Sequence, residues 1–369
     1  MLYRKYRPKT FKEIVGQDII VRILKNFLKN KNKIPQGYLF AGQRGTGKTS
    51  TARIFAKALN CLNFDLNDCE PCNQCINCEA INNGQFLDLI ELDAASNRGI
   101  DEIRNIKEHI GFRPIQGKYK VFIIDEAHML TEPAFNALLK TLEEPPKHAI
   151  FILATTEPEK IPPTILSRVQ RFDFRRIPIK DIVRKLKEIS ENEGIEVTER
   201  ALYLIAEEAE GALRDAETLL EKIILSLNPH KTITEEYVEE FLGKVSTREI
   251  LDFLEKLIER NFEESIKKIH KVYEEGYDLV VYVRSILKIL RDILVIKTLP
   301  IWEKQLIKDY EEEIVQKIIE ISKKINIDSV KKLIKLFSEA ELNIKRDPPI
   351  LTLPLELAAA EYIFEKETK

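Results

Sequence analysis

Short apolar segments alternate with amphipathic segments through the first half of this 369-residue chain. Between the short segments, apolar residues recur every three or four positions, as on one face of a helix. Continuous apolar runs that alternate with helices are typical of a parallel sheet covered on both faces. We therefore predict an α/β domain with a mostly parallel sheet and helices on both faces. The predicted strands are Gly37–Ala41, Leu87–Asp93, Val121–Asp125 and Ile150–Thr155.

The pattern changes near Ile177-Pro178, after which almost every segment is an amphipathic helix. We predict two helical regions, over residues 179–242 and 246–366. The second begins at Ser246, whose spacing to Glu249 is that of a capping box. Its helices are expected to break at Gly276, Pro300 and Asp347-Pro348-Pro349. The chain is thus predicted to form three domains, over residues 1–177, 178–243 and 244–369.

Composition and charge narrow the class of protein. There are 58 Lys and Arg residues against 60 Asp and Glu, so the net charge of −2 does not support a uniformly basic nucleic-acid binder. No stretch reaches the roughly 18 uncharged apolar residues that span a bilayer. The first eight residues are too polar for a signal peptide, so we expect a cytoplasmic protein with no membrane association.

A glycine-rich segment between a predicted strand and a predicted helix has the spacing of a phosphate-binding loop. Its glycines allow successive backbone N–H groups to curve around phosphates at a helix N-terminus. Lys48 is expected to neutralise the β- and γ-phosphates of ATP, and the Thr49 hydroxyl to bind Mg²⁺. The loop comprises Gly42, Gln43, Arg44, Gly45, Thr46, Gly47, Lys48 and Thr49.

Two adjacent carboxylates, Asp125 and Glu126, lie at the end of the apolar run that begins at Val121. Buried strands tolerate carboxylates only where these serve a site at the strand's carboxyl end. We expect Asp125 to hold Mg²⁺ and Glu126 to orient and deprotonate an attacking water. The pair therefore predicts ATP hydrolysis as well as ATP binding.

All five cysteines lie between residues 61 and 78. In a reducing compartment such a cluster is expected to bind a metal rather than to form disulfides. Cys72, Cys75 and Cys78 supply three thiolates, and a tetrahedral Zn²⁺ needs a fourth, from Cys61 or Cys69. With Cys69 the even spacing would resemble an iron–sulfur pattern, but the longer last spacer and trailing proline are missing. Four ligands spaced so closely in the sequence would also crowd the fourth coordination position, which favours Cys61 over Cys69.

The longer sequence strings resemble one known family, the gamma/tau subunits of bacterial DNA polymerase III. The likeness extends to about residue 365. It implies an AAA+ ATPase domain, a helical lid and an all-α collar, the last for assembly. It also implies a structural zinc site made by Cys61, Cys72, Cys75 and Cys78, in an inserted segment over residues 61–78 that we call the cysteine module. The strings are Tyr3–Pro8, Val15–Gln17, Asp125–Leu130, Ala137–Pro146 and Ser167–Arg168.

The resemblance also implies roles for residues whose function the spacing of motifs alone does not assign. Thr156 would sense the γ-phosphate, Arg168 would act as an arginine finger in a neighbouring subunit's site, and Arg214 would be a second sensor on the lid. In this family the finger motif usually reads Ser-Arg-Cys, whereas Val169 follows the arginine here. The adenine pocket would be lined by Tyr6, Arg7, Pro8 and Val15.

The implied function is that of the motor subunit of a clamp loader. Further copies of the chain would join delta and delta-prime subunits in a ring, open the sliding clamp with ATP, and release it around primed template DNA. Backbone shape rather than base sequence would be recognised. For Arg98 and Thr131, a solvated helix or loop position is a better interpretation than DNA contact, so neither joins the predicted site. The domains that tether helicase and polymerase in the family's longer form are not expected here.

Two other functions compete with this one. A branch-migration helicase would require a winged DNA-binding domain at the C-terminus, where the pattern is helical. A non-catalytic scaffold, similar to delta-prime, would not need Lys48, Thr49 and Glu126. We therefore favour the clamp-loader ATPase.

Overall fold

The structure is a computed structural model that describes residues 1–30, 34–97, 99, 108–226, 232–299, 310 and 312–364. The chain forms two compact units, Met1–Thr232 and Ile233–Lys369. The domain boundaries predicted at residues 177 and 243 stay predictions. Among the described residues, no helix combines the length and apolar character needed to cross a membrane.

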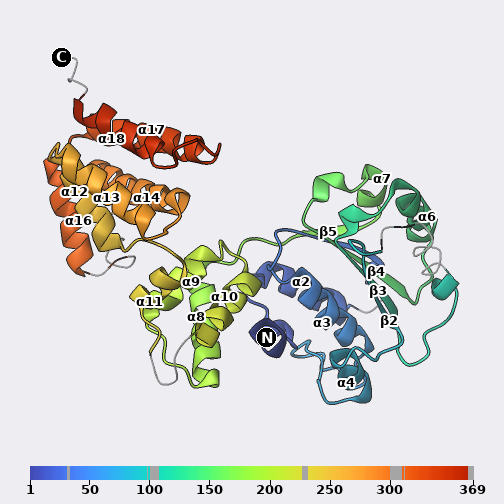
Figure 1. The fold of residues 1–369 in the computed structure, drawn as a ribbon. Coiled ribbons are helices and arrows are strands. Elements are labelled where there is room, and N and C mark those ends of the chain that lie inside the picture. Colours follow the sequence, from blue (N-terminus) through green and yellow to red (C-terminus); the bar gives the residue numbers. More distant parts are fainter. Residues whose placement is uncertain are drawn as a thin grey trace. The chain divides into compact units, whose positions relative to one another are not determined.

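Unit 1 is built on a five-stranded sheet whose order is β2-β3-β4-β1-β5 and whose neighbouring strands are all parallel (Figure 1). This confirms the predicted α/β fold. The fifth strand was not predicted, because only Phe172 of its four residues is buried and the run is too short and polar to stand out. The strands are β1 (Gly37–Ala41), β2 (Leu89–Asp93), β3 (Lys120–Asp125), β4 (Ala149–Thr155) and β5 (Gln170–Asp173).

Alternate residues of the strands enter two separate cores, one on each face of the sheet. On one face Tyr38 and Phe40 of β1 pack with α2 (Asp18–Lys29) and α3 (Lys48–Asn60). On the other face Leu39 packs with α6 (Glu132–Glu143) and α7 (Pro163–Leu166). The predicted helices on both faces are therefore present.

Unit 1 also contains several shorter elements. They are α1 (Leu2–Lys5), η1 (Phe11–Glu13), α4 (Ile76–Asn82), η3 (Ala127–Met129) and η4 (Pro158–Lys160). Three helices complete unit 1: α8 (Ile179–Glu193), α9 (Glu199–Glu208) and α10 (Leu213–Ser226). Helix α10 meets the N-terminus, where the Leu2 backbone N–H donates to Glu221 over 3.2 Å.

In the part of unit 2 that the structure describes, helices pack around a large apolar core that includes Phe253, Tyr282 and Phe337. Ser246 caps its second helix by accepting from the Glu249 backbone N–H at 3.3 Å, as the capping-box spacing predicted. Helices end around Gly276 and Asp347 as expected, whereas Pro300 lies outside the described residues. The helices are α11 (Glu235–Phe241), α12 (Thr247–Ile258), α13 (Phe262–Glu274), α14 (Leu279–Thr298), α16 (Glu312–Lys324), α17 (Ile327–Ile344) and α18 (Leu353–Phe364).

Candidate active site and metal centre

The phosphate-binding loop connects β1 to α3 and depends on glycine at defined points. Gly42, with φ +148°, runs so close to the following chain that a Cβ would lie 2.4 Å from the Phe174 carbonyl oxygen. Gly45, with φ +79°, would place a Cβ 2.9 Å from the Cβ of Ala212, just before α10. The loop is therefore held between the sheet and the three-helix part of unit 1.

Lys48 is buried at the first position of α3, with 6% of its surface exposed. Its ammonium donates to the carbonyl oxygens of Gly42 at 2.7 Å and Gln43 at 2.9 Å. Burial lowers the pKa of Lys48, while nearby Glu126 and Asp125 act in the opposite direction. The charge is thus fixed over the loop, where phosphate oxygens would be expected.

The two predicted magnesium ligands lie next to each other. The Thr49 hydroxyl donates to Asp125 Oδ2 over 2.7 Å, which brings the start of α3 to the end of β3. A hydroxyl and a carboxylate at hydrogen-bond distance are donors of the type that Mg²⁺ takes from proteins. The pair therefore fits the predicted ion.

Glu126 follows β3 in the left-handed region, with φ +47°, an uncommon conformation for a residue with a side chain. Its Oε2 accepts from the Thr156 hydroxyl at 3.2 Å, so the predicted sensor at the end of β4 touches the predicted base. His128 was not predicted to belong to the site. Its Nδ1 lies 3.5 Å from Glu126 Oε2 and its Nε2 3.1 Å from Glu157 Oε1.

These groups open into a pocket of about 920 Å³. Most of the predicted site residues line it: Arg7, Pro8, Val15, Arg44, Gly45, Thr46, Gly47, Lys48, Thr49, Asp125, Glu126 and Arg214. Gly42, Gln43, Tyr6, Thr156 and Arg168 are not among the lining residues. Other lining residues were missed by sequence reasoning, because no motif assigned them to the site: Tyr3, Arg4, Ile14, Ser50, Arg53, Asn82, Asp93, Ala95, Ile177, Leu213 and Glu217.

The N-terminal segment contributes Arg7, Pro8, Ile14 and Val15 to the pocket lining, and we call this part of the lining the base end. Arg7 donates through Nε to the Ser50 hydroxyl at 3.3 Å. Burial lowers the pKa of Arg7 to about 10, and nearby Arg53 adds to the effect. The segment is therefore tied to α3, directly behind the phosphate-binding loop.

Tyr6, which is predicted to line the adenine pocket, contacts a helix through its hydroxyl. Its hydroxyl donates to Glu193 Oε1 at 2.5 Å, at the end of α8. This hydrogen bond raises the pKa of Tyr6 to about 12, and burial contributes. Tyr6 thus joins the N-terminal segment to α8.

Arg214 and Glu217 reach the pocket from α10. The Arg214 guanidinium lies 4.6 Å from the centre of the Tyr3 ring, within the range of a cation–π contact. Glu217 is 5% exposed, and burial raises its pKa to about 7, while Lys185 acts to lower it. A wall of the pocket is therefore supplied by a helix far from the phosphate-binding loop in the sequence.

Arg168 lies away from the pocket, between α7 and β5. Its guanidinium donates to the Thr164 carbonyl oxygen at 2.7 Å and forms an ion pair with Glu143 at 2.7 Å. Val169, the departure from the family's motif, packs at the edge of the core that contains Leu39. Valine is therefore accommodated next to the predicted finger.

The sulfurs of Cys61, Cys72, Cys75 and Cys78 all lie within 4.8 Å of one another. Tetrahedral Zn²⁺ with four thiolates at ~2.3 Å requires sulfur separations of about 3.8 Å, close to the 3.9 Å between Cys72 and Cys78. The backbone N–H groups of Cys72 and Cys75 each donate to a cluster sulfur at 3.3 Å. The arrangement is compatible with zinc.

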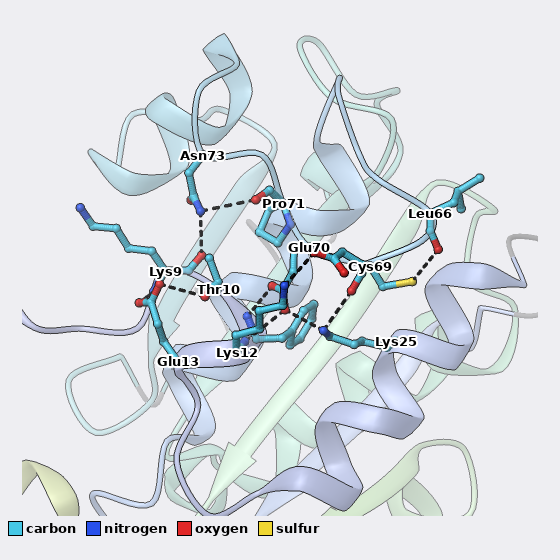
Figure 2. A network of polar contacts seen from close by, with 12 residues as sticks. Lys9, Thr10, Lys12, Glu13, Lys25, Leu66, Cys69, Glu70, Pro71 and Asn73 are labelled. Atoms are coloured by element: carbon cyan, nitrogen blue, oxygen red, sulfur yellow. Dashed lines mark hydrogen bonds and ion pairs between the residues drawn. The ribbon is translucent and has the colours of Figure 1, made fainter. Parts of the chain in front are cut away.

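Cys69 is buried outside this cluster. Its thiol donates to the Leu66 carbonyl oxygen at 3.3 Å, as Figure 2 shows. Its φ of +53° belongs to a tight turn of the cysteine module. The four clustered sulfurs are thus those of the predicted zinc ligands.

Of the two positions considered for DNA, Thr131 is the N-cap residue of α6. Arg98 lies outside the described residues. The preceding loop is held by Asp93, which accepts from the Ala95 backbone N–H at 2.9 Å.

Three family models match successive parts of the chain. Residues 16–178 match the model of the DNA polymerase III delta subunit, and residues 181–226 match the ATPase lid domain of the DNA polymerase III clamp loader subunit. Residues 233–353 match domain III of the DNA polymerase III subunits gamma and tau.

Named relatives agree with these matches. The chain is 42% identical over 350 residues to the DNA polymerase III subunit tau of Bacillus subtilis, which is 93% of this chain but 60% of that protein. It is 39% identical over 328 residues to the DNA polymerase III subunit gamma of Buchnera aphidicola, covering 89% of each. The chain therefore spans less than two thirds of the longer Bacillus relative.

Among solved structures, the RuvB Holliday junction branch migration motor of Thermotoga maritima has a TM-score of 0.48 and 19% identity, over 69% of this chain and 80% of that one. A likeness of that degree says nothing about what this chain does. The family is shown by the sequence relatives, because one of them is matched over most of its own length: the chain belongs to the gamma/tau family of DNA polymerase III clamp-loader subunits.

Proposed function

We propose that this chain binds and hydrolyses MgATP and acts as the motor subunit of a clamp loader, which places a sliding clamp on primed DNA. One observation carries the proposal: the phosphate-binding loop, the Thr49–Asp125 pair and Glu126 open into one pocket that Arg214 also lines. Membership of the gamma/tau family supports the same function.

The chemistry would be divided among the side chains in and next to this pocket. Lys48 would neutralise the β- and γ-phosphates, and Thr49 with Asp125 would hold the Mg²⁺ that offsets charge on the transferred phosphoryl group. Glu126 would orient the attacking water and accept its proton. Thr156, bonded to Glu126 at 3.2 Å, would contact the γ-phosphate with the same hydroxyl.

ATP would also bridge two parts of unit 1. The phosphates would rest on the loop after β1, while Arg214 approaches them from α10. A ligand shifts a conformational equilibrium only by its differential contacts with the two states. Arg214 supplies such a contact, since it reaches the ligand only when α10 lies against the loop.

Arg168 is proposed to complete the site of a neighbouring subunit. It does not line the pocket of its own chain, and its side-chain exposure of 32% leaves it accessible. A guanidinium supplied in trans stabilises the charge that spreads over the phosphoryl group in the transition state. Hydrolysis would then depend on how subunits are seated, with delta, delta-prime and further copies of this chain as the proposed neighbours.

The four-cysteine cluster is proposed to hold a structural Zn²⁺. Four protein sulfurs leave no open coordination position for a substrate, which distinguishes such a site from a catalytic one. The ion would fix residues 61–78, which extend from the end of α3.

ATP turnover tests the proposal most directly. We expect Lys48→Ala to lose both ATP binding and turnover, and Glu126→Gln to keep binding but lose turnover by at least about 100-fold. Wild-type turnover should rise when clamp, partner subunits and primed DNA are added. Unchanged turnover in Glu126→Gln would exclude its role as the base. A lack of stimulation by clamp and primed DNA would exclude the clamp-loader function while leaving the ATPase intact.

A further inference from the structure

The cysteine module lies against the N-terminal segment through one carboxylate. Glu70 accepts from the backbone N–H of Phe11 at 2.7 Å and of Lys12 at 3.1 Å, and from Lys25 Nζ at 2.6 Å. Figure 2 shows these bonds, which join residue 70 to the start of η1 and to α2. Three donors therefore converge on a single side chain from a different part of the sequence.

This network is shielded from water. The side chains of Glu70 and Lys25 are 11% and 21% exposed, whereas those of the neighbouring Asp68–Lys12 pair are 59% and 63% exposed. Charge-assisted hydrogen bonds are stronger than neutral ones, and shielding from solvent preserves their strength. Glu70 should thus contribute far more to local order than Asp68 does.

The two backbone groups that Glu70 binds lie between the residues that form the base end of the pocket. Arg7 and Pro8 precede Phe11, and Ile14 and Val15 follow η1 directly. Phe11 is also buried in the core with α2 and α3, so this point of the segment has an apolar as well as a polar anchor. Fixing the peptide groups at residues 11 and 12 therefore orients the pocket-lining residues on both sides of them.

The cysteine module is also bonded to α3 through Asn73. Lys57, 2% exposed on that helix, donates to Asn73 Oδ1 at 2.5 Å and to Asn82 Oδ1 at 2.7 Å. Asn82 lines the pocket, and Asn73 Nδ2 donates to the Lys9 carbonyl oxygen at 3.4 Å. Asn73, which directly follows Cys72, is thus bonded to the N-terminal segment at Lys9 and linked through Lys57 to Asn82 of the pocket.

We propose that Glu70 is a positioning residue that couples the order of the cysteine module to the base end of the nucleotide pocket. The inference rests on the proposed ATP binding. Metal held by the four cysteines would keep the 61–78 segment ordered, Glu70 would hold η1, and the adenine side of ATP would bind a preformed surface. Because such coupling is reciprocal, bound ATP would in turn strengthen metal retention.

Binding of two ligands separates positioning from a general loss of structure. Tripolyphosphate needs the phosphate-binding loop but not the base end. For Glu70→Gln we expect the ATP dissociation constant to rise about tenfold, the loss of one charged hydrogen bond, with tripolyphosphate affinity within about twofold of wild type. Asp68→Asn, the same acid-to-amide change in the exposed pair, should leave both affinities unchanged.

Removal of zinc is the second test of the proposal, and the metal content is measured for every sample. Removal of the metal from the wild type with a chelator should weaken ATP binding about as much as Glu70→Gln does. The same treatment of the Glu70→Gln variant should weaken its ATP binding little further. In the wild type, hydrogen exchange at the amides of Phe11 and Lys12 should accelerate on stripping, a readout that needs no variant.

Three results would overturn the inference: unchanged ATP affinity in zinc-replete Glu70→Gln, an equal loss for ATP and tripolyphosphate, or additive effects of stripping and substitution. Wild-type protein that binds no ATP would instead overturn the proposed function.

Discussion

Single positions around the pocket are restricted by their backbone conformation and by the space beside them. Glu126 is held in the left-handed region, which costs a residue with a side chain about 1–2 kcal/mol. Such outliers concentrate where a side chain must be aimed, and here the turn after β3 directs the carboxylate toward Thr156 and the pocket. The same restriction at Gly45 and the burial of Glu217 lead to two predictions.

Gly45 and Gly194 form a matched pair, since both have positive φ, at +79° and +70°, but only Gly45 faces another atom closely. Gly194→Ala should cost about 1 kcal/mol of unfolding free energy, from the backbone conformation alone. Gly45→Ala should cost more and weaken ATP binding, because its Cβ would meet Ala212 at 2.9 Å. Denaturant unfolding and ATP titration test this prediction. Equal losses of unfolding free energy in the two variants, with unchanged ATP affinity in Gly45→Ala, would contradict it.

Glu217 should make stability depend on pH. Its pKa is raised by burial from 4.5 to about 7, so the folded state holds the proton more tightly than the unfolded state. Stability from this group is full below pH 4.5, falls as pH rises toward 7, and is constant above, a change of at most about 3 kcal/mol. Glu217→Gln should therefore be more stable relative to wild type at pH 8 than at pH 5, in urea unfolding at both values. A difference independent of pH would disprove the assignment.

Helix α3 shows how one element connects several others. It begins at the phosphate-binding loop, is buried along most of its length, and ends at Asn60 immediately before the first clustered cysteine. Asn60 Oδ1 accepts from the backbone N–H groups of Lys118 and Tyr119 at 2.8 Å each, which ties the helix end to the chain entering β3. The cysteine module thus extends from an element fixed at both ends.

The metal assignment within this module predicts opposite outcomes for two nearby cysteines. Cys61→Ser should lose bound zinc, because a serine hydroxyl is a poor replacement for a thiolate ligand. Cys69→Ser should retain one equivalent, since the Cys69 sulfur lies outside the cluster. Metal analysis of the two purified variants tests this assignment. Loss of zinc from Cys69→Ser, or its retention in Cys61→Ser, would contradict it.

For the molecule as a whole, two features of the described residues are of the kind that an assembly would use. Arg168 lies outside its own chain's pocket. Large apolar side chains of unit 2 remain exposed on and beside α17 and α18, a pattern that marks interaction surfaces; they are Leu342, Ile350, Leu353, Leu357 and Phe364. These observations support the proposed ring, in which active sites are shared between subunits.

Arg168→Ala should therefore affect turnover only in the assembled state. A single chain should bind ATP with unchanged affinity, whereas DNA-stimulated turnover of the complex should fall by at least about 10³-fold, as for other arginine fingers. Arg171→Ala is the control, because Arg171 is a nearby exposed arginine paired with Asp173 on β5. Equal turnover of both variants in the complex, or weakened ATP binding by the isolated Arg168→Ala chain, would contradict the role in trans.

Features that depend on residues adjacent in the chain could be predicted from the sequence alone. Four strands and the two-faced sheet follow from local apolar runs, and the glycine spacing around Lys48 restricts what the loop after β1 can bind. The grouping of Cys72, Cys75 and Cys78 follows from their separation by only two residues. In each case the constraint acts between residues that are close in the sequence. It is the backbone conformation for the loop, the alternation of side chains for the strands, and the short distance between ligands for the cysteines.

Features built from distant segments are decided only by the tertiary structure. Strand β5 forms because β1 offers it a free edge, and Glu217 lines the pocket because α10 folds against the phosphate-binding loop. Tyr6 meets Glu193 at the end of α8. Glu70 meets Phe11 across 59 positions of sequence. No local pattern specifies such contacts, since each results from the packing of whole elements, whose cores and hydrogen bonds are satisfied together or not at all.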